Sequence, residues 1–257
     1  MLKHRLFISI IFINLITFSQ DPWGGLSVST PENLDAISIN PAGLGLSRGN
    51  QSGFYFPFDS VFTIHSSNRN EGFGYDLTYQ FIDGKMPDYF NPYDGNIAFG
   101  TKLCNNTYAG FKWNKHKLLD FGLLYRPLNQ VSIGATIQFD DKFNTYRQSS
   151  FGFSIRPFLK HYLTLGADIQ NLNDDDSIYI YPHIAIEPLD GISISAQSNI
   201  EFSNYKINIA FNFGKDRIYS PNYINEQNEY SGGIGFYTDT QVKKTIFNKK
   251  SKDKKKY

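Results

Sequence analysis

A period-two alternation of apolar and polar residues recurs along most of this sequence and limits what it can fold into. In one segment Val131, Ile133, Ala135, Ile137 and Phe139 alternate with polar or small residues. Successive side chains of a β-strand point to opposite faces, so such a segment has one apolar and one polar face. We find about thirteen such segments, at residues 51–58, 60–67, 72–82, 95–104, 106–114, 117–126, 131–141, 146–157, 161–171, 177–187, 191–201, 205–215 and 229–240.

The length of these segments favours a membrane barrel. Most have 8–12 residues, whereas strands of soluble proteins have a mode of about 5–6 and a tilted strand across a bilayer needs about 9–11. Single-chain bacterial barrels have even strand numbers. The sequence therefore predicts an all-β fold, an antiparallel transmembrane β-barrel of about 14 strands, with 12 as the alternative. A soluble β-sandwich or lipocalin-like barrel with an aromatic core is the competing interpretation.

Composition supports an aromatic-rich β protein. The 257 residues include 23 Phe, 17 Tyr and 2 Trp, and a mean hydropathy of −0.37 excludes a bundle of transmembrane helices. A single cysteine, Cys104, excludes an intramolecular disulfide. Tyrosines and phenylalanines near strand ends are candidates for interfacial girdles, namely Phe54, Tyr55, Phe56, Tyr79, Phe81, Tyr108, Trp113, Tyr125, Tyr179 and Tyr181.

The connections between these segments fit antiparallel neighbours. Several are short and polar, such as Asn105-Asn106 and the turn at residues 114–116. Two are longer, at residues 82–95 and 216–229, and we expect both on the outer face, where such barrels carry their longer loops.

The two ends of the chain differ from its body. Residues 1–19 have a basic start, Lys3 and Arg5, followed by a short apolar run, which is the layout of a secretory signal peptide. Residues 241–257 carry eight Lys against Asp253 and predict a solvated, disordered tail. The ends contribute +2 and +7 to a net charge of +1, so residues 20–240 carry about −8. With export predicted, the Lys-rich tail does not indicate nucleic-acid binding.

Residues 20–50 do not alternate. Residues 32–39 predict two helical turns with Thr30 as N-cap and Pro31 at the first helical position. Pro41 ends that helix, and the following glycines permit a tight reversal into the first strand at residue 51.

A family resemblance begins in this segment. Gly24-Gly25, Asp35-Ala36 and the motif Asn40, Pro41, Ala42, Gly43, Leu44, placed just after a signal peptide, resemble the start of FadL/PorV-like (OmpP1/FadL/TodX-type) outer-membrane β-barrels. The resemblance implies a 14-stranded barrel in the cell outer membrane at residues 51–240, with residues 20–50 as a plug inside the lumen. It also implies either uptake of small hydrophobic molecules or partnership in secretion.

A second resemblance concerns the tail. A stretch such as Lys243 to Lys250 is similar to a linker between a barrel-like module and the catalytic domain of signal peptide peptidases of the protease IV type. This implies the alternative function of a non-transporting membrane anchor for a secretion or peptidase partner. The catalytic domain itself does not lie within these 257 residues.

We identify no catalytic constellation. The histidines are scattered, and the sequence has no GxSxG, P-loop or dinucleotide-binding pattern. We therefore expect a non-enzymatic barrel without metal or cofactor, whose partners are outer-membrane lipid and a small molecule. Its lumen is predicted to be lined by polar residues of the alternating segments, Thr136, Gln138, Asp168, Gln170, Asn208 and Asn212.

Overall fold

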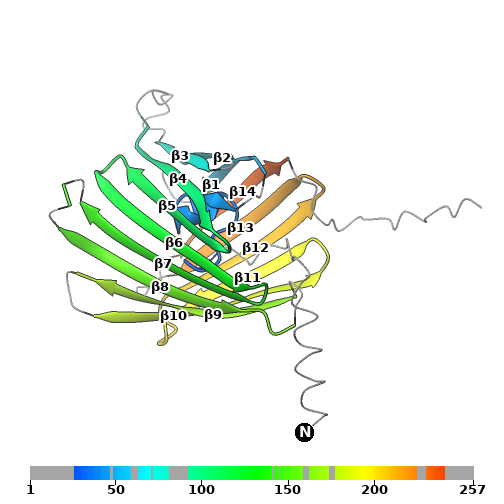
Figure 1. Cartoon of the computed structure of the whole chain (residues 1–257). Coiled ribbons are helices and arrows are strands. Elements are labelled where there is room, and N and C mark those ends of the chain that lie inside the picture. Colours follow the sequence, from blue (N-terminus) through cyan, green and yellow to red (C-terminus); the bar gives the residue numbers. More distant parts are fainter. Residues whose placement is uncertain are drawn as a thin grey trace, which may run out of the picture.

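The computed structural model is a closed barrel of fourteen antiparallel strands (Figure 1). It describes residues 26–46, 49–58, 63–70, 72–80, 92–140, 142–143, 145–158, 162–173, 177–224 and 230–240. The predicted signal peptide, the first residues of the predicted plug and the Lys-rich tail lie outside these ranges. The strands are β1 (Gln51–Pro57), β2 (Thr63–Asn70), β3 (Phe73–Gln80), β4 (Asp94–Cys104), β5 (Thr107–Asn114), β6 (Leu118–Leu128), β7 (Val131–Asp140), β8 (Tyr146–Ile155), β9 (Leu163–Leu172), β10 (Ile178–Leu189), β11 (Ile192–Ser198), β12 (Tyr205–Phe213), β13 (Asp216–Ile224) and β14 (Tyr230–Asp239).

The barrel closes because the first strand pairs with the last. The β1–β14 ladder runs from Gln51 opposite Asp239 to Pro57 opposite Gly233. All the remaining strand pairs join neighbours in the sequence, so no sheet edge is left with an unpaired backbone. The all-β fold class and the count of fourteen strands are confirmed.

Apolar side chains cover the outside of the barrel. On β6 the outward Phe121, Leu123 and Tyr125 are exposed, whereas Leu124 between them is fully buried against the lumen. Outward phenylalanines at paired positions of adjacent strands form a row of ring contacts, Phe73–Phe99–Phe111–Phe121, with centroid separations of 5.1, 5.4 and 6.5 Å. A belt of this kind matches the hydrocarbon core of a bilayer and excludes a soluble sandwich with an aromatic centre.

Strand β13 corrects one expectation from the sequence. Residues 216–229 are not one long connection, because Asp216–Ile224 form β13 between β12 and β14. Pro221 obscures this strand in the sequence, since it has no N–H to donate to a ladder. The β13–β14 register accordingly lacks pairs at residues 220 and 221, and the Ser220 hydroxyl donates to the Gly233 carbonyl (2.9 Å).

Four of the proposed girdle aromatics face the lumen, among them Tyr179, which lies two residues before Tyr181 on the same face of β10. Tyr55 and Tyr181 line internal cavities, and Tyr108 packs against an internal apolar cluster. The prediction relied on position near a strand end and did not separate the two faces, although successive residues of a strand, such as Phe54 and Tyr55, point to opposite faces. Phe54, Trp113 and Tyr125 do point outward, and Phe81 lies outside the described residues.

The barrel has two unlike ends. At the end where β1 begins and β14 finishes, here called the terminal end, most turns have only two residues between strands, and Gly72 and Gly191 there adopt the positive φ that such turns require. The opposite end, here called the loop end, carries longer connections, including the one between β3 and β4. Within the described residues, no helix is long and apolar enough to cross a membrane.

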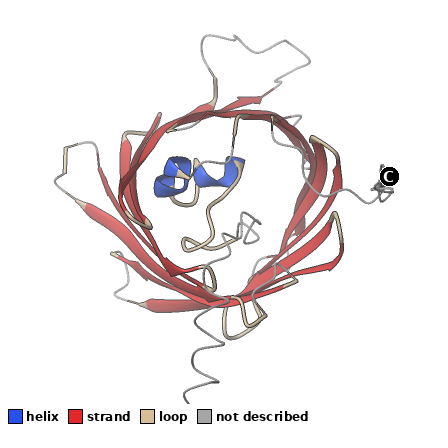
Figure 2. Ribbon diagram, turned by 45° about the vertical axis from the view of Figure 1, so that its right-hand side comes forward, coloured by secondary structure: helices blue, strands red, loops and turns tan. Residues whose placement is uncertain are grey.

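Residues 26–46, here called the plug, lie inside the ring of strands, as Figure 2 shows for their two short helices. These are the 3-10 helices η2 (Leu34–Ala36) and η3 (Pro41–Gly45). The predicted helix over residues 32–39 is therefore wrong in length, and Thr30 does not cap it, because its hydroxyl accepts from the Ser27 amide instead. The cap falls on η3, where the Asn40 side chain accepts from the Ala42 amide (3.1 Å) and Pro41 occupies the first position.

The outward belt yields a stability prediction. Leu123→Arg places a charge in the middle of an outward apolar face, so the free energy of unfolding should fall by about 2–4 kcal/mol. Urea titration in phospholipid vesicles measures it.

The control places a charge on the other face at the same level. Thr136 opposes Gly122 in the β6–β7 register and lines a lumenal cavity, so Thr136→Lys should change stability by no more than about 1 kcal/mol. Equal losses for the two variants would contradict the assignment of the faces.

Candidate functional site

The plug meets the barrel wall at a row of inward-facing glycines. Gly100, Gly110 and Gly122 lie on β4, β5 and β6, and a Cβ added at any of them would approach residues 40–45 of the plug closer than 3.0 Å. Gly134 on β7 and Gly152 on β8 face Val28 in the same way. Because these positions carry no side chain, the plug backbone packs directly on the backbone of the wall.

Asn40 joins two parts of the plug to the wall. Its amide nitrogen donates to the carbonyls of Val28 (2.7 Å) and of Leu123 on β6 (3.0 Å). Its amide oxygen caps η3. Both donors and the oxygen of one buried side chain thus hold the start of η3 against the wall.

Arg69 on β2 is the largest polar anchor of the plug. Its guanidinium is fully buried and donates to four plug carbonyls, those of Glu32, Asn33 (3.1 Å), Gly43 (2.9 Å) and Leu46 (3.0 Å). A non-helical segment inside a barrel has carbonyls that strands do not satisfy. The planar, multi-donor guanidinium supplies those partners from one position.

An ion pair links the plug to β6. Glu32 is fully buried and its carboxylate contacts the Arg126 guanidinium at 2.6 Å. Arg126 Nε also donates to the Ser132 hydroxyl, and that hydroxyl donates to the Ser29 carbonyl of the plug. Removing one partner of such a buried pair is costly, because the other charge then stays buried without compensation.

The first part of the plug is bound to β8 and β9. Asp168 accepts from the Ser27 hydroxyl (2.5 Å) and from the Val28 amide (3.2 Å). The hydroxyls of Ser29 and Ser154 bond to each other, and Ser154 continues to His183 Nε2 (2.9 Å). The plug therefore contacts the wall from β1 to β9.

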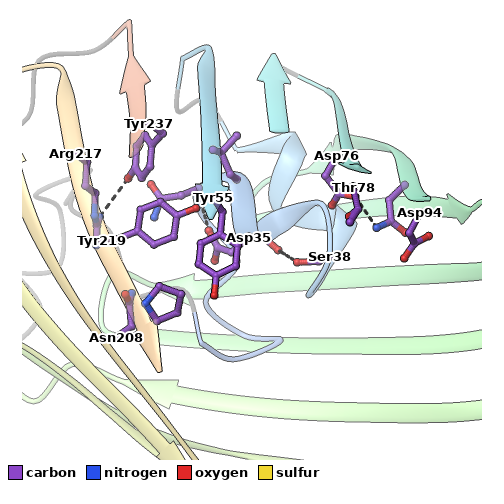
Figure 3. Close-up of a pocket in the computed structure, with 14 residues that line it drawn as sticks. Asp35, Ser38, Tyr55, Asp76, Thr78, Asp94, Asn208, Arg217, Tyr219 and Tyr237 are labelled. Atoms are coloured by element: carbon purple, nitrogen blue, oxygen red, sulfur yellow. Dashed lines mark hydrogen bonds between the residues drawn. The ribbon is translucent and has the colours of Figure 1, made fainter. Parts of the chain in front are cut away.

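The larger lumenal cavity, of about 500 Å³, lies between the plug and the inward faces of β12, β13, β14, β1, β3 and β4. Figure 3 shows Tyr55, Tyr219 and Tyr237 with Arg217 on one side, Asp76 and Asp94 on the other, and the plug between them. The Tyr55 and Tyr219 rings are stacked, with centroids 6.3 Å apart and planes 16° apart. Gly233 and Gly235 of β14 accommodate these two rings. One side of the cavity is therefore aromatic and the other acidic.

A second cavity, of about 310 Å³, lies against β7 to β13. Its lining is mainly polar and includes Lys206, whose ammonium group lies 5.8 Å from the Tyr223 ring centroid. The exposed Ser38 of the plug borders both cavities. The plug thus forms one wall of each space.

Asp35 is the plug's carboxylate in the larger cavity. Burial raises its pKa from 3.8 to about 6, and the positive charge of Arg69 only partly offsets this effect. One of its oxygens accepts from the Asn33 amide (2.8 Å), while the other is buried without a hydrogen-bond partner. Near neutral pH the cavity therefore contains a poorly compensated negative charge.

The polar residues predicted to line the lumen all lie on inward positions, but in different settings. Thr136 and Gln170 line the smaller cavity, Asn208 lines the larger one and Asp168 holds the plug. Gln138 donates to Asp120 (2.6 Å), and Asn212 is buried near the terminal end with its side-chain oxygen unpartnered. The motif Asn40 to Leu44 coincides with η3 and its cap.

Searches against family models and against curated proteins found no match, whereas comparison with solved structures found outer-membrane barrels. Omp33 of Acinetobacter baumannii aligns with a TM-score of 0.53 and 9% identity, over 76% of this chain and 99% of that one. A mutant of TodX, described as a monoaromatic hydrocarbon channel, aligns with a TM-score of 0.53 and 9% identity, over 84% of this chain and 99% of that one. The chain has the fold of an outer-membrane β-barrel.

The sequence analysis missed the cations that organise this barrel. Arg69, Arg126 and Arg217 each stand on the inward face of a strand, and the first two hold the plug. The sequence did hold a signal for Arg126, because the alternation of β6 places it on the inward face, two residues after the buried Leu124. Among the described residues, no group of three or more His, Cys, Asp or Glu side chains could hold a metal ion.

The glycine row predicts how the plug can be released. Gly110→Val adds a branched side chain where the backbone of Pro41 and Ala42 now lies, so the plug should leave the wall while the barrel stays closed. The reporter is Ala42→Cys in a Cys104→Ser background, since Ala42 is fully buried and Cys104 is exposed. Maleimide labelling at position 42 should accelerate by about tenfold or more when the plug is released.

Ala109→Val is the matched control, because it places the same valine side chain one residue away on the opposite face of β5. It should leave the labelling rate unchanged. Unchanged labelling in Gly110→Val as well would show that the plug does not depend on this contact.

Proposed function

We propose that this protein is an outer-membrane channel that binds a small, partly apolar molecule in the lumen and passes it when the plug moves. The terminal end, with its short turns, faces the periplasm, and the loop end faces outward. The observation that carries the proposal is the position of the larger cavity, which lies in the lumen between the plug and the wall formed by β12 to β14, β1, β3 and β4.

The character of the cavity supports a ligand with an apolar body. Three tyrosines and Leu34 supply apolar surface, and the volume of about 500 Å³ lies in the range of small-molecule sites. The TodX likeness is in keeping with a channel role for this fold, although the polar and charged groups around the cavity differ from a purely apolar site.

The plug supplies the gating element. Polar contacts from Arg69, Arg126 and Asp168 hold it, and its apolar contacts form two small clusters, Ala36, Ile37, Leu44 and Ala98, and Ala42, Leu46 and Leu124. A segment held mainly by individual polar contacts can detach without opening the barrel ladder.

The alternative function, a non-transporting anchor for a secretion or peptidase partner, depends on the tail at residues 241–257. That tail lies outside the described residues, and nothing in the lumen favours this function. If the channel test below fails, the anchor function is the hypothesis that stands.

Solute flux through proteoliposomes tests the channel proposal. Arg69→Leu removes the donor to four plug carbonyls, so efflux of a small neutral solute should rise by about tenfold or more relative to the wild type. Arg147→Leu is the control, because Arg147 is an exposed residue on the outward face of β8, opposite the face that Gly152 and Ser154 turn to the plug.

Both variants must first migrate as folded barrels on unboiled gels. A folded Arg69→Leu barrel that passes no more solute than the wild type or Arg147→Leu would contradict the channel proposal and favour the anchor.

A further inference from the structure

Two opposite charges lie unbalanced on the walls of the larger cavity. Arg217 of β13 is 8% exposed, and its guanidinium donates only to neutral groups, the hydroxyls of Tyr237 (3.2 Å) and Ser193 (2.9 Å). Within the part of the chain that the structure describes, no carboxylate forms an ion pair with it. Its Nε is buried, has no hydrogen-bond partner and belongs to a residue that lines the cavity.

Asp35 presents the opposite case on the plug. One oxygen of its carboxylate is buried in the same cavity lining without a partner. Arg69 donates to four backbone carbonyls, and its charge offsets that of the Asp35 carboxylate only in part. Asp76 of β3 and Asp94 of β4 lie across the cavity from Arg217 and add further negative charge to its lining. Buried charges without compensation are unfavourable, so a ligand that neutralises them gains affinity.

The surface between these charges suits a flat apolar group. The rings of Tyr55 and Tyr219 are stacked. The ring centroid of Tyr237 lies 6.0 Å from that of Tyr219, and the Arg217 guanidinium lies over the Tyr237 ring. Arg217 and Asp35 line the same cavity as these rings, so a ligand whose ring or short apolar chain rests on this surface has both charges within the same space.

We infer that the larger cavity selects a small zwitterion with an apolar body, its anionic group bound by Arg217 and its cationic group by Asp35. This inference rests on the proposed function and narrows it from partly apolar molecules in general to one charge pattern. An aromatic α-amino acid has this pattern, and so do other compact molecules with an ammonium and a carboxylate group. A neutral hydrocarbon would leave both charges uncompensated.

Four probes with similar bodies isolate the two charges. They are phenylalanine, which carries both, phenethylamine with only the cation, 3-phenylpropionate with only the anion, and ethylbenzene with neither. Equilibrium dialysis of labelled probes against the full chain in a non-ionic detergent gives the affinities. Phenylalanine should bind about 10- to 100-fold more tightly than either singly charged probe, as expected for one added charge-assisted contact.

Substitutions assign each charge to its residue. Arg217→Gln should lower the affinity for phenylalanine and phenylpropionate by about tenfold or more and leave phenethylamine unchanged. Asp35→Asn should do the reverse, affecting phenylalanine and phenethylamine only. Lys206→Gln, which removes a cation from the smaller cavity, is the matched control and should change none of them.

Arg217→Lys provides a second variant should Arg217→Gln fail to fold, because it keeps the charge but loses the Nε donor and the planar fork. It should weaken phenylalanine binding less than Arg217→Gln. Equal or tighter binding of ethylbenzene, equal effects of Lys206→Gln and Arg217→Gln, or no binding of any probe would overturn the inference. Solute flux that still depends on Arg69 in that case would leave the channel proposal standing, so the two failures are distinguishable.

Discussion

Direct packing of the plug backbone on the barrel wall is the contact on which the rest of this structure depends. Gly110 and Gly122 permit it, because any side chain there would occupy the space of Pro41 and Asn40. Close approach leaves many backbone groups of the plug away from strand ladders, so each needs another partner. Arg69 and Asn40 supply those partners. The glycines and the buried polar anchors are thus two parts of one arrangement.

This arrangement also explains why the space in the lumen is uneven. The plug packs on the glycines of β4 to β8, and two cavities remain: the larger is bordered by β12 to β14 with β1, β3 and β4, and the smaller by β7 to β13. The residues that line the larger cavity come from both the plug and the wall, Asp35 from one and Arg217 from the other. A movement of the plug would therefore change the binding site and the path through the barrel together, which couples occupancy to passage.

Much of the barrel could be predicted from the sequence, because a strand between lipid and water records its two faces as alternation. β7 illustrates this directly, with Val131 to Phe139 outward at every second position. β13 could not be predicted in the same way, since Pro221 and three large inward side chains, Arg217, Tyr219 and Tyr223, blur its pattern. The plug was harder still, because its helices are set by contacts with distant strands, such as that of Asn40 with Leu123, rather than by local propensity. The role of Arg217 could not be predicted either, because it depends on the lack of an ion-pair partner among the described residues.

Hydrogen–deuterium exchange of the protein in lipid nanodiscs tests the central claim most directly. If the plug is docked on the glycine face, peptides covering residues 36–46 exchange about as slowly as those of the neighbouring strands β4 to β6, since their amides are buried and bonded, as Gly43 is to Asn40. Exchange of these plug amides at the rate of an unfolded segment, with the strands still protected, would contradict it. In that case the lumen would be open, and the larger cavity would lack the plug residues, Asp35 among them, that line it.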